Sequence, residues 1–273
     1  VIINYMSKKP LVSILIASYN KEKFVSRCIE SCLFQSYKNI EIIFFDDGST
    51  DNSYQIAKRY KKINVIKNTK KNKNSKFNTY PQLNSYVHAF KKSKGKIISF
   101  LDSDDYYQKN KIKEIVEYFK NNSNSLVVFD KPIHVFSNNK KIYPFKNINN
   151  KLKKNIWPKF PPQSCISIKK RFFKHFFQDI INKDYSMLTL DFRISILSNI
   201  VLKDFFIIDK NLTYYYQDIH GESLSKFKKF GVNWWLRRGQ AHNYVRHISK
   251  KYDIRYNMNL DHLITSLLVK FIK

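Results

Sequence analysis

LVSILIA, residues 11–17, is a continuous run of apolar and β-branched residues. Such a run is typical of a strand that is buried on both faces of a parallel sheet. Two similar runs follow it, IEIIFF (40–45) and KIISFL (96–101). Apolar residues at helical spacing lie between these runs, over about 21–33 and 81–92. The alternation predicts an α/β fold, with right-handed crossovers and a mostly parallel central sheet flanked by helices.

The remaining elements are predicted from the same two periodicities. Ser49 or Thr50 is expected to cap a helix that runs to about Tyr60. A hairpin is expected over 133–145, with Asn138-Asn139 at its turn. The other predicted elements are strands at 64–67, 126–129, 164–168 and 205–216 and helices at 109–120, 187–198, 234–252 and 260–272.

The composition of the chain excludes several classes of protein. The chain has 273 residues, of which 43% are hydrophobic and 16% aromatic, so it can bury a large core and is not disordered as a whole. No apolar stretch approaches the roughly 18 residues of a transmembrane helix. The first ten residues are too short and polar for a signal peptide. Three cysteines, an odd number, suggest reduced thiols and a cytoplasmic location.

Two of the cysteines share one helical face. Cys28 and Cys32 are four residues apart within the first predicted helix. They have the spacing of a pair of metal ligands, but no His or Cys partner lies near them in the sequence. A place in the hydrophobic core is therefore the favoured interpretation.

The charge is strongly basic. Fifty Lys and Arg against 21 Asp and Glu give a formal net charge of +29 and a pI near 9.9. Such an excess is typical of proteins that bind a polyanion, whether nucleic acid, an anionic membrane or a phosphorylated substrate. A solvated surface without a specific partner is the alternative, because the chain is rich in Lys and Asn throughout.

Acidic clusters follow two of the predicted buried strands, at 46–51 and 102–105. In an open α/β sheet the ligand crevice lies at the carboxyl ends of the strands. Carboxylates grouped there repel one another unless a cation offsets them. Asp102, Asp104 and Asp105 therefore suggest Mg²⁺ or Mn²⁺ together with phosphate oxygens. The alternative for Asp105 is a role at a helix start.

Three segments resemble the signature segments of family 2 glycosyltransferases, which are inverting enzymes with the GT-A, Rossmann-like fold. They are VSILIASYN (12–20), IEIIFFDDGSTDNS (40–53) and SKGKIISFLDSDD (93–105). The resemblance covers roughly 10–130 closely and 160–226 loosely. It implies a catalytic domain over 1–226, with a nucleotide-sugar half at about 10–130 and an acceptor half at 131–226, and a helical C-terminal extension over 227–273.

The resemblance also implies donor-binding roles, residue by residue. Ala17 and Tyr19 would line the nucleotide, although Ala17-Ser18 stands where the family commonly has Pro-Thr. Asp46 and Asp47 would hold the base and the ribose. Asp102, Ser103 and Asp104 form the D-x-D motif that meets the ribose and the metal-bound diphosphate, with Asp104 as a metal ligand. Gln82 would contact the donor, in a segment where many members carry Arg-Asn-x-Gly.

The implied general base is Asp191, in the segment LTLDFR (188–193). The family has a Glu-Asp pair there, and Leu190 replaces the Glu. The alternative is that Asp191 only starts a helix near Arg193, in which case Asp184 is the substitute base.

YYYQDIHGES (214–223) resembles the family's Tyr-Arg-x-His…Ser stretch, without the Arg and with one residue more. His220 would then be a metal or phosphate contact, or else a plain surface histidine. The lysines that follow would hold the leaving diphosphate or lie in a solvated loop: Lys226, Lys228 and Lys229.

Together these features predict a Mn²⁺- or Mg²⁺-dependent transferase. It would move a sugar from a nucleotide diphosphate, with UDP favoured, to a hydroxyl of a surface glycan or lipid-linked acceptor. Three rivals stay open. A nucleic-acid-binding protein fits the charge but shows no known motif. A sugar-phosphate nucleotidylyltransferase should have a Gly-rich basic loop, which ASYNKEK (17–23) lacks. A non-catalytic donor-binding scaffold fits the missing Glu.

The C-terminal helices leave two placements open. Trp234-Trp235 and the apolar stripe over 260–272 suit a helix that lies on the anionic inner membrane from the cytoplasmic side. Packing on the catalytic domain or on a second subunit, as in a homodimer, is the preferred alternative.

Overall fold

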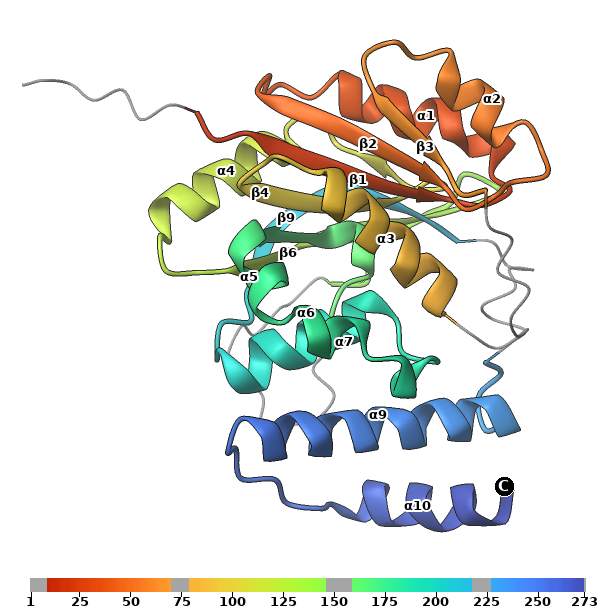
Figure 1. The fold of residues 1–273 in the computed structure, drawn as a ribbon, viewed down its shortest axis with the longest axis vertical. Helices are drawn as coiled ribbons and strands as arrows, with labels where there is room; N and C mark the ends of the chain where they lie inside the picture. The colour runs from red at the N-terminus through yellow and green to blue at the C-terminus, as the bar shows by residue number, and fades with distance from the viewer. Residues whose placement is uncertain (1–8, 70–78, 146–158, 218–226, 273) are drawn as a thin grey trace, which may run out of the picture.

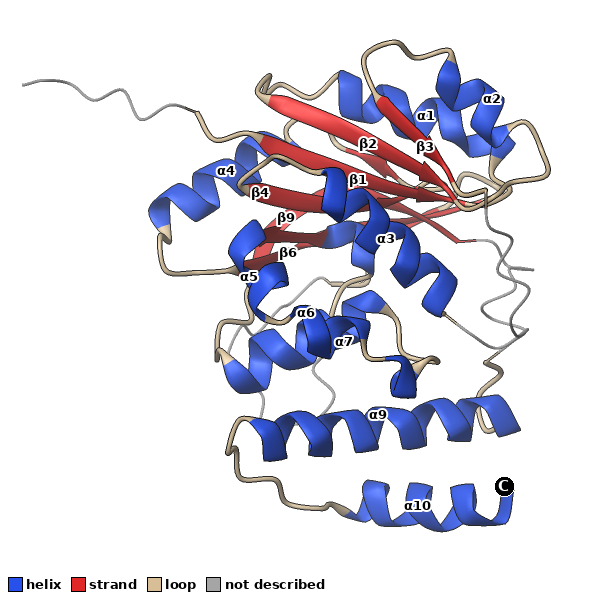
Figure 2. Ribbon diagram, viewed as in Figure 1, coloured by secondary structure: helices blue, strands red, loops and turns tan. Residues whose placement is uncertain are grey.

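A mixed β-sheet forms the centre of the fold (Figure 1, Figure 2). The computed structural model describes residues 9–69, 79–145, 159–217 and 227–272. Within these residues the strand order is β3-β2-β1-β4-β8-β6-β9-β5, and β7 pairs with the outer part of β6. The strands are β1 (Val12–Ser18), β2 (Ile40–Asp46), β3 (Asn64–Lys67), β4 (Ile97–Asp102), β5 (Tyr106–Tyr107), β6 (Val127–Phe136), β7 (Lys141–Ile142), β8 (Ile166–Lys169) and β9 (Ile207–Gln217).

The first half of the sheet is parallel, as the sequence predicts. β1 pairs in parallel with both β2 and β4, and β2 with β3. Both faces of β1 are buried, because Ile14 and Ile16 enter one core while Leu15 and Ala17 enter the other. Three helices line the first core: α1 (Glu22–Leu33), α2 (Ser53–Lys58) and α4 (Lys111–Asn121). α3 (Tyr80–Lys92) lines the second core, together with helices from the second half of the chain.

The second half of the sheet is mixed. β8 runs antiparallel to both β4 and β6, whereas β9 runs parallel to β6 and antiparallel to β5. The predicted hairpin is confirmed, since Val135 pairs with Lys141 and Asn139 takes a positive φ of 60° at the turn. The predicted 126–129 strand continues into that hairpin as the single strand β6.

The predicted cap of the second helix is wrong. Ser49 Oγ accepts a hydrogen bond from the Asn20 amide (3.0 Å), and the Thr50 amide donates to Asn20 Oδ1 (2.8 Å). The acidic turn is thus attached to the loop after β1, and α2 begins only at Ser53 and ends at Lys58. Gly48, with φ of 79°, lets the chain leave β2 sharply enough for this contact.

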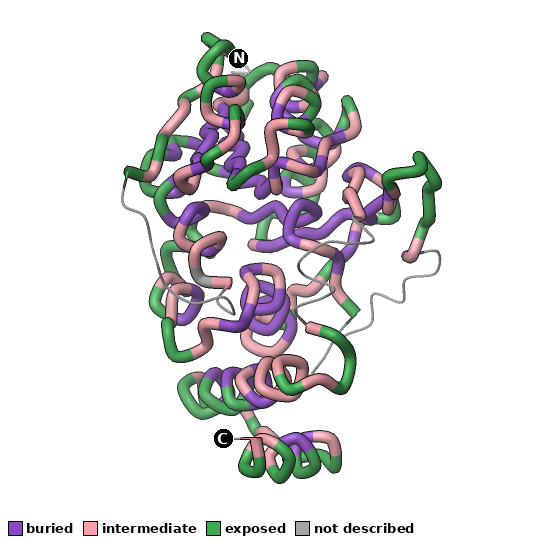
Figure 3. Tube along the Cα trace, turned by 90° about the vertical axis from the view of Figure 1, so that its right-hand side faces the viewer, coloured by how far each residue is buried: buried purple, intermediate pink, exposed green. Residues whose placement is uncertain are grey.

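Helices stack below the second half of the sheet in successive layers. α5 (Lys170–His175), α6 (Phe177–Ile181) and α7 (Leu190–Ile196) lie against it, and a π-helical turn, Leu197–Val201, extends α7. α9 (Val232–Lys251) adds Tyr244, Val245 and Ile248 to the second core, the one that contains Leu15 and Ala17. α10 (Leu260–Ile272) forms the outermost layer, packed on α9 (Figure 1, Figure 3).

The structure answers two smaller questions. Cys28 and Cys32 are fully buried in the core that α1 lines, which confirms the core interpretation. Burial raises the pKa of the Cys32 thiol to about 12, so the thiol stays protonated. Among the described residues, no helix has the length and apolar character needed to cross a bilayer.

Candidate active site

The ends of three parallel strands bring the predicted donor-binding residues to one edge of the sheet. In the strand register Ser18 pairs with Asp46, and Ala17 pairs with Asp102. The Ser103 amide donates to the carbonyl oxygen of Ala17 (3.1 Å), which fixes the turn after β4 against the end of β1. The predicted residues from three distant segments therefore share the edge where α/β folds bind their ligands.

The two aspartates that end β2 have different environments. Asp46 is fully buried, and its Oδ2 accepts hydrogen bonds from the amides of Gly48 (3.2 Å) and Ser49 (3.0 Å). Its Oδ1 has no hydrogen-bond partner in the described part of the chain. Asp47 is partly exposed and accepts a bond from Asn68 (2.7 Å), while burial raises the pKa of Asp47. Asp46 thus holds the turn, and Asp47 lies at the surface of the site.

Asp102 is held by three donors. Tyr86, Gln82 and Gln163 donate to its Oδ1 at 2.8, 2.9 and 2.8 Å. Burial, followed by the nearby charge of Asp104, raises the pKa of Asp102 to about 6. Predicted as a donor contact, Gln82 contacts the carboxylate of the D-x-D motif. Tyr86 and Gln163 were missed, because nothing in their local sequence marks them.

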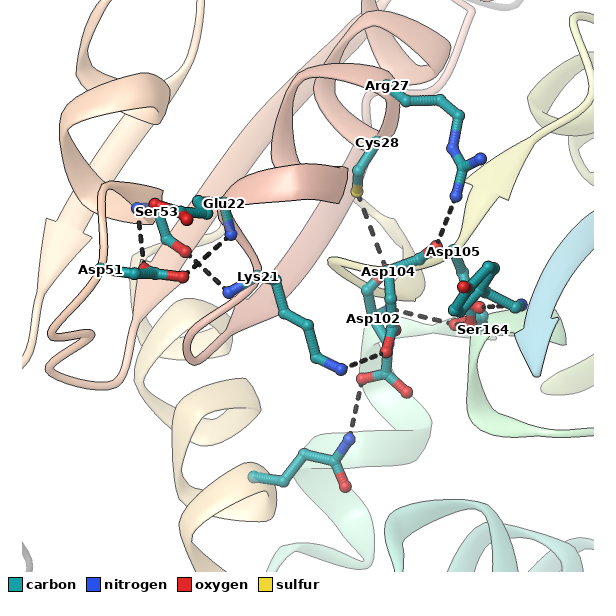
Figure 4. Close-up of polar contacts among 12 residues, drawn as sticks. Lys21, Glu22, Arg27, Cys28, Asp51, Ser53, Asp102, Asp104, Asp105 and Ser164 are labelled. Atoms are coloured by element: carbon teal, nitrogen blue, oxygen red, sulfur yellow. Dashed lines mark hydrogen bonds and ion pairs between the residues drawn. The ribbon is translucent and has the colours of Figure 1, made fainter. Parts of the chain in front are cut away.

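Asp104 forms an ion pair with Lys21. Lys21 Nζ lies 2.7 Å from Asp104 Oδ2, and both side chains are partly exposed (Figure 4). Although burial opposes it, the charge of Asp104 and then those of Asp102 and Asp105 raise the pKa of Lys21. In the described part of the chain, Oδ1 of Asp104 accepts no hydrogen bond. This carboxylate therefore keeps a lone pair for a ligand, beside a fixed positive charge.

Asp105 points away from that pair (Figure 4). Its carboxylate accepts hydrogen bonds from Ser164 Oγ and from the amide of Tyr216 (2.8 Å). Burial and the charges of Asp104 and Asp102 raise the pKa of Asp105 well above its ordinary value. Asp105 does not start a helix, because β5 follows it directly. It connects the β4 turn to β9, and the suggestion of three aspartates around one cation needs this correction.

The acidic cluster has the chemistry for one divalent cation, held mainly by Asp104. Within the described ranges, no group of three His, Cys, Asp or Glu side chains has the arrangement of a metal site. Mg²⁺ and related ions commonly use one or two protein carboxylates and complete their shell with water and phosphate oxygens. Asp104, with its accessible oxygen, fits that kind of site. The cluster of buried carboxylates, two with raised pKa values, has the excess negative charge that a cation offsets.

Asp191 lies in the first turn of α7. Its Oδ1 accepts hydrogen bonds from Thr189 Oγ1 and from the amide of Phe192 (2.7 Å). Burial raises the pKa of Asp191, and the charge of Arg237 on α9 opposes that rise. Asp191 thus has the helix-start position that the alternative interpretation expected. Arg193 lies two residues further along α7. It is fully buried and donates to the carbonyl oxygens of Ile180, Asn182, Tyr185 and Leu188.

Tyr215 on β9 pairs with His134 of β6, and the charges of both the acidic cluster and Asp191 act on it. Burial raises the pKa of this tyrosine, and four carboxylates raise it further: Asp105, Asp102, Asp191 and Asp104, in that order. Tyr215 on β9 is therefore within electrostatic reach of both the D-x-D motif and the candidate base.

The other predicted residues are less tied to this cluster. Tyr19 is 56% exposed at the exit of β1. Asp184 is exposed in the turn Lys183–Tyr185. Lys228 and Lys229 are exposed, and the Lys229 ammonium lies 4.9 Å from the Phe230 ring centre. His220 and Lys226 lie outside the described residues.

Comparison with known proteins shows a consistent family likeness. A model of the family described as "Glycosyl transferase family 2" matches residues 13–177. The UDP-Glc:alpha-D-GlcNAc-diphosphoundecaprenol beta-1,3-glucosyltransferase WfaP of Escherichia coli is 40% identical over 110 residues, 40% of this chain and 41% of the relative. The putative teichuronic acid biosynthesis glycosyltransferase TuaG of Bacillus subtilis is 33% identical over 120 residues, 42% of this chain and 44% of the relative. The matches thus span less than half of these relatives' own lengths.

A solved structure has the same fold. The S. aureus TarS 1–349 structure in complex with UDP-GlcNAc aligns with 96% of this chain and 71% of its own, with a TM-score of 0.60 and 16% sequence identity. This agreement confirms the expected GT-A-like α/β fold, including the helical C-terminal part.

Proposed function

Since the chain belongs to glycosyl transferase family 2, we propose that it transfers a sugar from a UDP-sugar to a hydroxyl of a bacterial surface glycan or a lipid-linked acceptor. The observation that carries the proposal is the convergence of Asp46, Asp102 and Asp104 at the carboxyl ends of neighbouring strands, because a transferase needs a site for the nucleotide diphosphate. The relatives support the substrate classes. WfaP is named for a UDP-glucose donor and a diphosphoundecaprenol-linked acceptor, and TarS was solved with UDP-GlcNAc.

The donor is proposed to lie along the carboxyl ends of β2, β1 and β4. Ala17 and Tyr19 would line the nucleotide, and Asp46 and Asp47 would hold the base and ribose. Asp46 reaches this role with a buried Oδ1 that lacks a partner among the described residues. Asp102 and Ser103 would meet the ribose, and Gln82 would position Asp102 through their 2.9 Å hydrogen bond.

A Mn²⁺ or Mg²⁺ ion is part of the proposal. Asp104 would hold it through the oxygen that Lys21 leaves accessible, and His220 is proposed as a further ligand. When bound, such an ion neutralises charge on a diphosphate and so makes it a better leaving group. Lys21, already 2.7 Å from Asp104, would contribute a second positive charge on the same side of the diphosphate.

Asp191 is proposed as the general base. As the acceptor oxygen forms its bond to the anomeric carbon, the bond from that carbon to the diphosphate oxygen breaks and UDP leaves. The hydroxyl proton passes to a carboxylate oxygen of Asp191. The raised pKa of Asp191 favours this transfer, because it makes the carboxylate a stronger base than an exposed aspartate. Inversion at the anomeric carbon follows from attack opposite the leaving group.

The proposed division of the chain follows these roles. Residues 1–226 would form the catalytic domain, with a donor half at about 10–130 and an acceptor half at 131–226. Residues 227–273 would form a helical extension. The helical extension packs directly on the catalytic domain, because Arg237 of α9 donates to Thr189 (3.3 Å) beside the candidate base. We place the protein on the cytoplasmic side, where nucleotide sugars are available.

The proposal can be tested with nucleotide sugars and Mn²⁺. Thermal melting is recorded with each nucleotide sugar, with and without the ion, and a donor identifies itself by raising the Tm. The best donor is then incubated with diphosphoundecaprenol-linked acceptors, and product is followed by mass spectrometry. Asp104→Asn should abolish the Mn²⁺-dependent part of the Tm shift. Asp253→Asn, at an exposed position in the turn after α9, is the matched control. An Asp104→Asn protein that keeps the whole shift would remove the metal assignment.

A further inference from the structure

α10 turns its apolar side chains away from the protein. Six of them form one stripe at helical spacing, and each is exposed: Leu260 (72%), Leu263 (47%), Ile264 (43%), Leu267 (57%), Leu268 (36%) and Phe271 (87%). A surface helix of a globular protein normally faces its apolar stripe toward the core. In α10 this arrangement is reversed, and Figure 3 colours much of this last helix as exposed.

The inward face of α10 makes specific polar contacts with α9. The His262 ring stacks on the buried His242 ring of α9, with centroids 4.5 Å apart and an interplanar angle of 7°. Asp261 accepts from Arg238 Nη2 (2.6 Å), and its Oδ2 lies 3.1 Å from His242 Nε2. Thr265 is buried on the same side. These contacts fix the rotation of the helix, so turning the apolar stripe inward would break an ion pair and the histidine stack.

The net charge of the two C-terminal helices is positive and favours an anionic partner. Between residues 232 and 272 there are seven Lys and Arg against two Asp. Asp261 is already paired with Arg238, whereas Arg246, Lys250, Arg255 and Lys270 are exposed. Two copies of this chain meeting through α10 would bring together two surfaces of the same net positive charge, which is unfavourable. An anionic lipid surface attracts the same charges while its acyl region accepts the apolar side chains.

The length of α10 suits a helix that lies in the plane of a membrane. Thirteen residues make a helix of about 20 Å, which is too short to span a bilayer. We propose that α10 is a membrane-docking helix, which inserts the stripe from Leu260 to Phe271 into the surface of an anionic bilayer.

This placement deepens the proposed function, on which it rests for the lipid-linked acceptor. Consecutive residues of α9 serve the two sides: Arg237 donates to Thr189 beside Asp191, and Arg238 pairs with Asp261 of α10. Only α9 therefore lies between α10 and the candidate base. A sugar acceptor on a membrane lipid would meet the site close to the bilayer surface.

Flotation with lipid vesicles tests the inference. The full chain is mixed with vesicles of phosphatidylcholine containing phosphatidylglycerol, and with vesicles of phosphatidylcholine alone. We expect the protein to float with the anionic vesicles and to bind the neutral ones much more weakly. The double variant Leu267→Ser with Phe271→Ser should reduce the partition coefficient about tenfold or more, because it removes two large apolar side chains from the inserted face. Both positions are exposed, so folding should be preserved.

Phe34→Ser is the matched control, since Phe34 is 69% exposed but lies at the end of α1. It should float like the unmodified protein. Unimpaired flotation of the double variant, or no preference for anionic vesicles, would overturn the inference. So would a dimer in analytical ultracentrifugation that the double variant converts to a monomer, because a second copy would then cover the stripe. The UDP-sugar Tm shift, measured on the same variants, reports separately on the proposed function.

Discussion

Lys21 Nζ lies 2.7 Å from Asp104 Oδ2, so an ion pair joins the loop after β1 to the turn after β4. The two residues are 83 positions apart in the sequence and meet because β1 and β4 are neighbours in the sheet. A fixed ammonium group therefore occupies one oxygen of the carboxylate that is proposed to bind the metal. On this proposal, the ammonium group and the cation would compete for this carboxylate until a diphosphate supplies additional negative charge.

Lys21→Met should raise the affinity for Mn²⁺ in the absence of nucleotide by about tenfold, since the variant removes a competing charge from Asp104. Isothermal titration calorimetry with MnCl₂ measures this change. Lys23→Met is the control, because Lys23 is exposed on the same segment. An affinity that is unchanged or lower in Lys21→Met would show that Lys21 and the metal do not share Asp104.

Asp191→Asn should lower kcat by about 10²-fold or more, within the range that a general base contributes, and leave the KM for the donor nearly unchanged. Asparagine keeps an oxygen that can accept the hydrogen bond from the Phe192 amide, so the start of α7 should persist. Initial rates with a labelled donor provide the measurement. Asp184→Asn is the control, and it should be active. If Asp184→Asn were the inactive variant, the two assignments would have to be exchanged.

Acid should loosen the contact between α9 and α10. Burial and the nearby His262 lower the pKa of His242 to about 4, although Asp261 opposes this. Arg238 lowers the pKa of His242 as well, and Arg246 lowers the pKa of His262. The folded state thus favours neutral His242, whereas the unfolded chain takes up a proton near its ordinary value of 6.5. This contribution to stability is complete above about pH 6.5 and is lost as the pH falls toward 4.

The measurement is thermal melting at about pH 7.5 and about pH 5. His242→Gln should reduce the acid-induced fall in Tm by about 5 °C relative to the unmodified protein, because glutamine does not titrate. His247→Gln, on the exposed side of α9, should not change the fall. Equal falls in all three proteins would show that His242 is not a source of the acid sensitivity.

Arg193→Met should lower the free energy of unfolding by about 3 kcal/mol or more, because it removes a fully buried guanidinium group that donates to four carbonyl oxygens. Urea denaturation followed by circular dichroism measures this loss. Arg171→Met is the control: Arg171 is exposed on α5, and its replacement should change stability by no more than about 0.5 kcal/mol. A small effect of Arg193→Met would mean that water or rearranged side chains satisfy those carbonyls.

The parallel half of the fold could be predicted because its information is local. Residues 11–17 and 40–45 are apolar on both faces, and this pattern suits only a strand covered on both sides. Asp46 and Asp102 could be placed at one edge for the same reason, since parallel neighbours end together. The mixed half was harder: the order β8-β6-β9 and the short β5 depend on pairings between distant segments, which no local pattern encodes.

The residues that surround the aspartates of the site could be found only from the tertiary structure. Gln163, Tyr215 and Arg237 come from three different elements. In the sequence, nothing distinguishes these polar residues from polar residues at the surface. The predicted cap at Ser49 failed for a related reason, since the Asn20 loop competes for the same groups.

The sequence by itself determined the strands, the family motifs and the amphipathic character of the last helix, because each depends on residues close together in the chain. Only the tertiary structure decided which charges meet, as for Lys21 with Asp104, and which way α10 faces. The amphipathic sequence of α10 shows that the helix has an apolar side. The polar contacts of Asp261 and His262 with α9 determine the direction in which that side points.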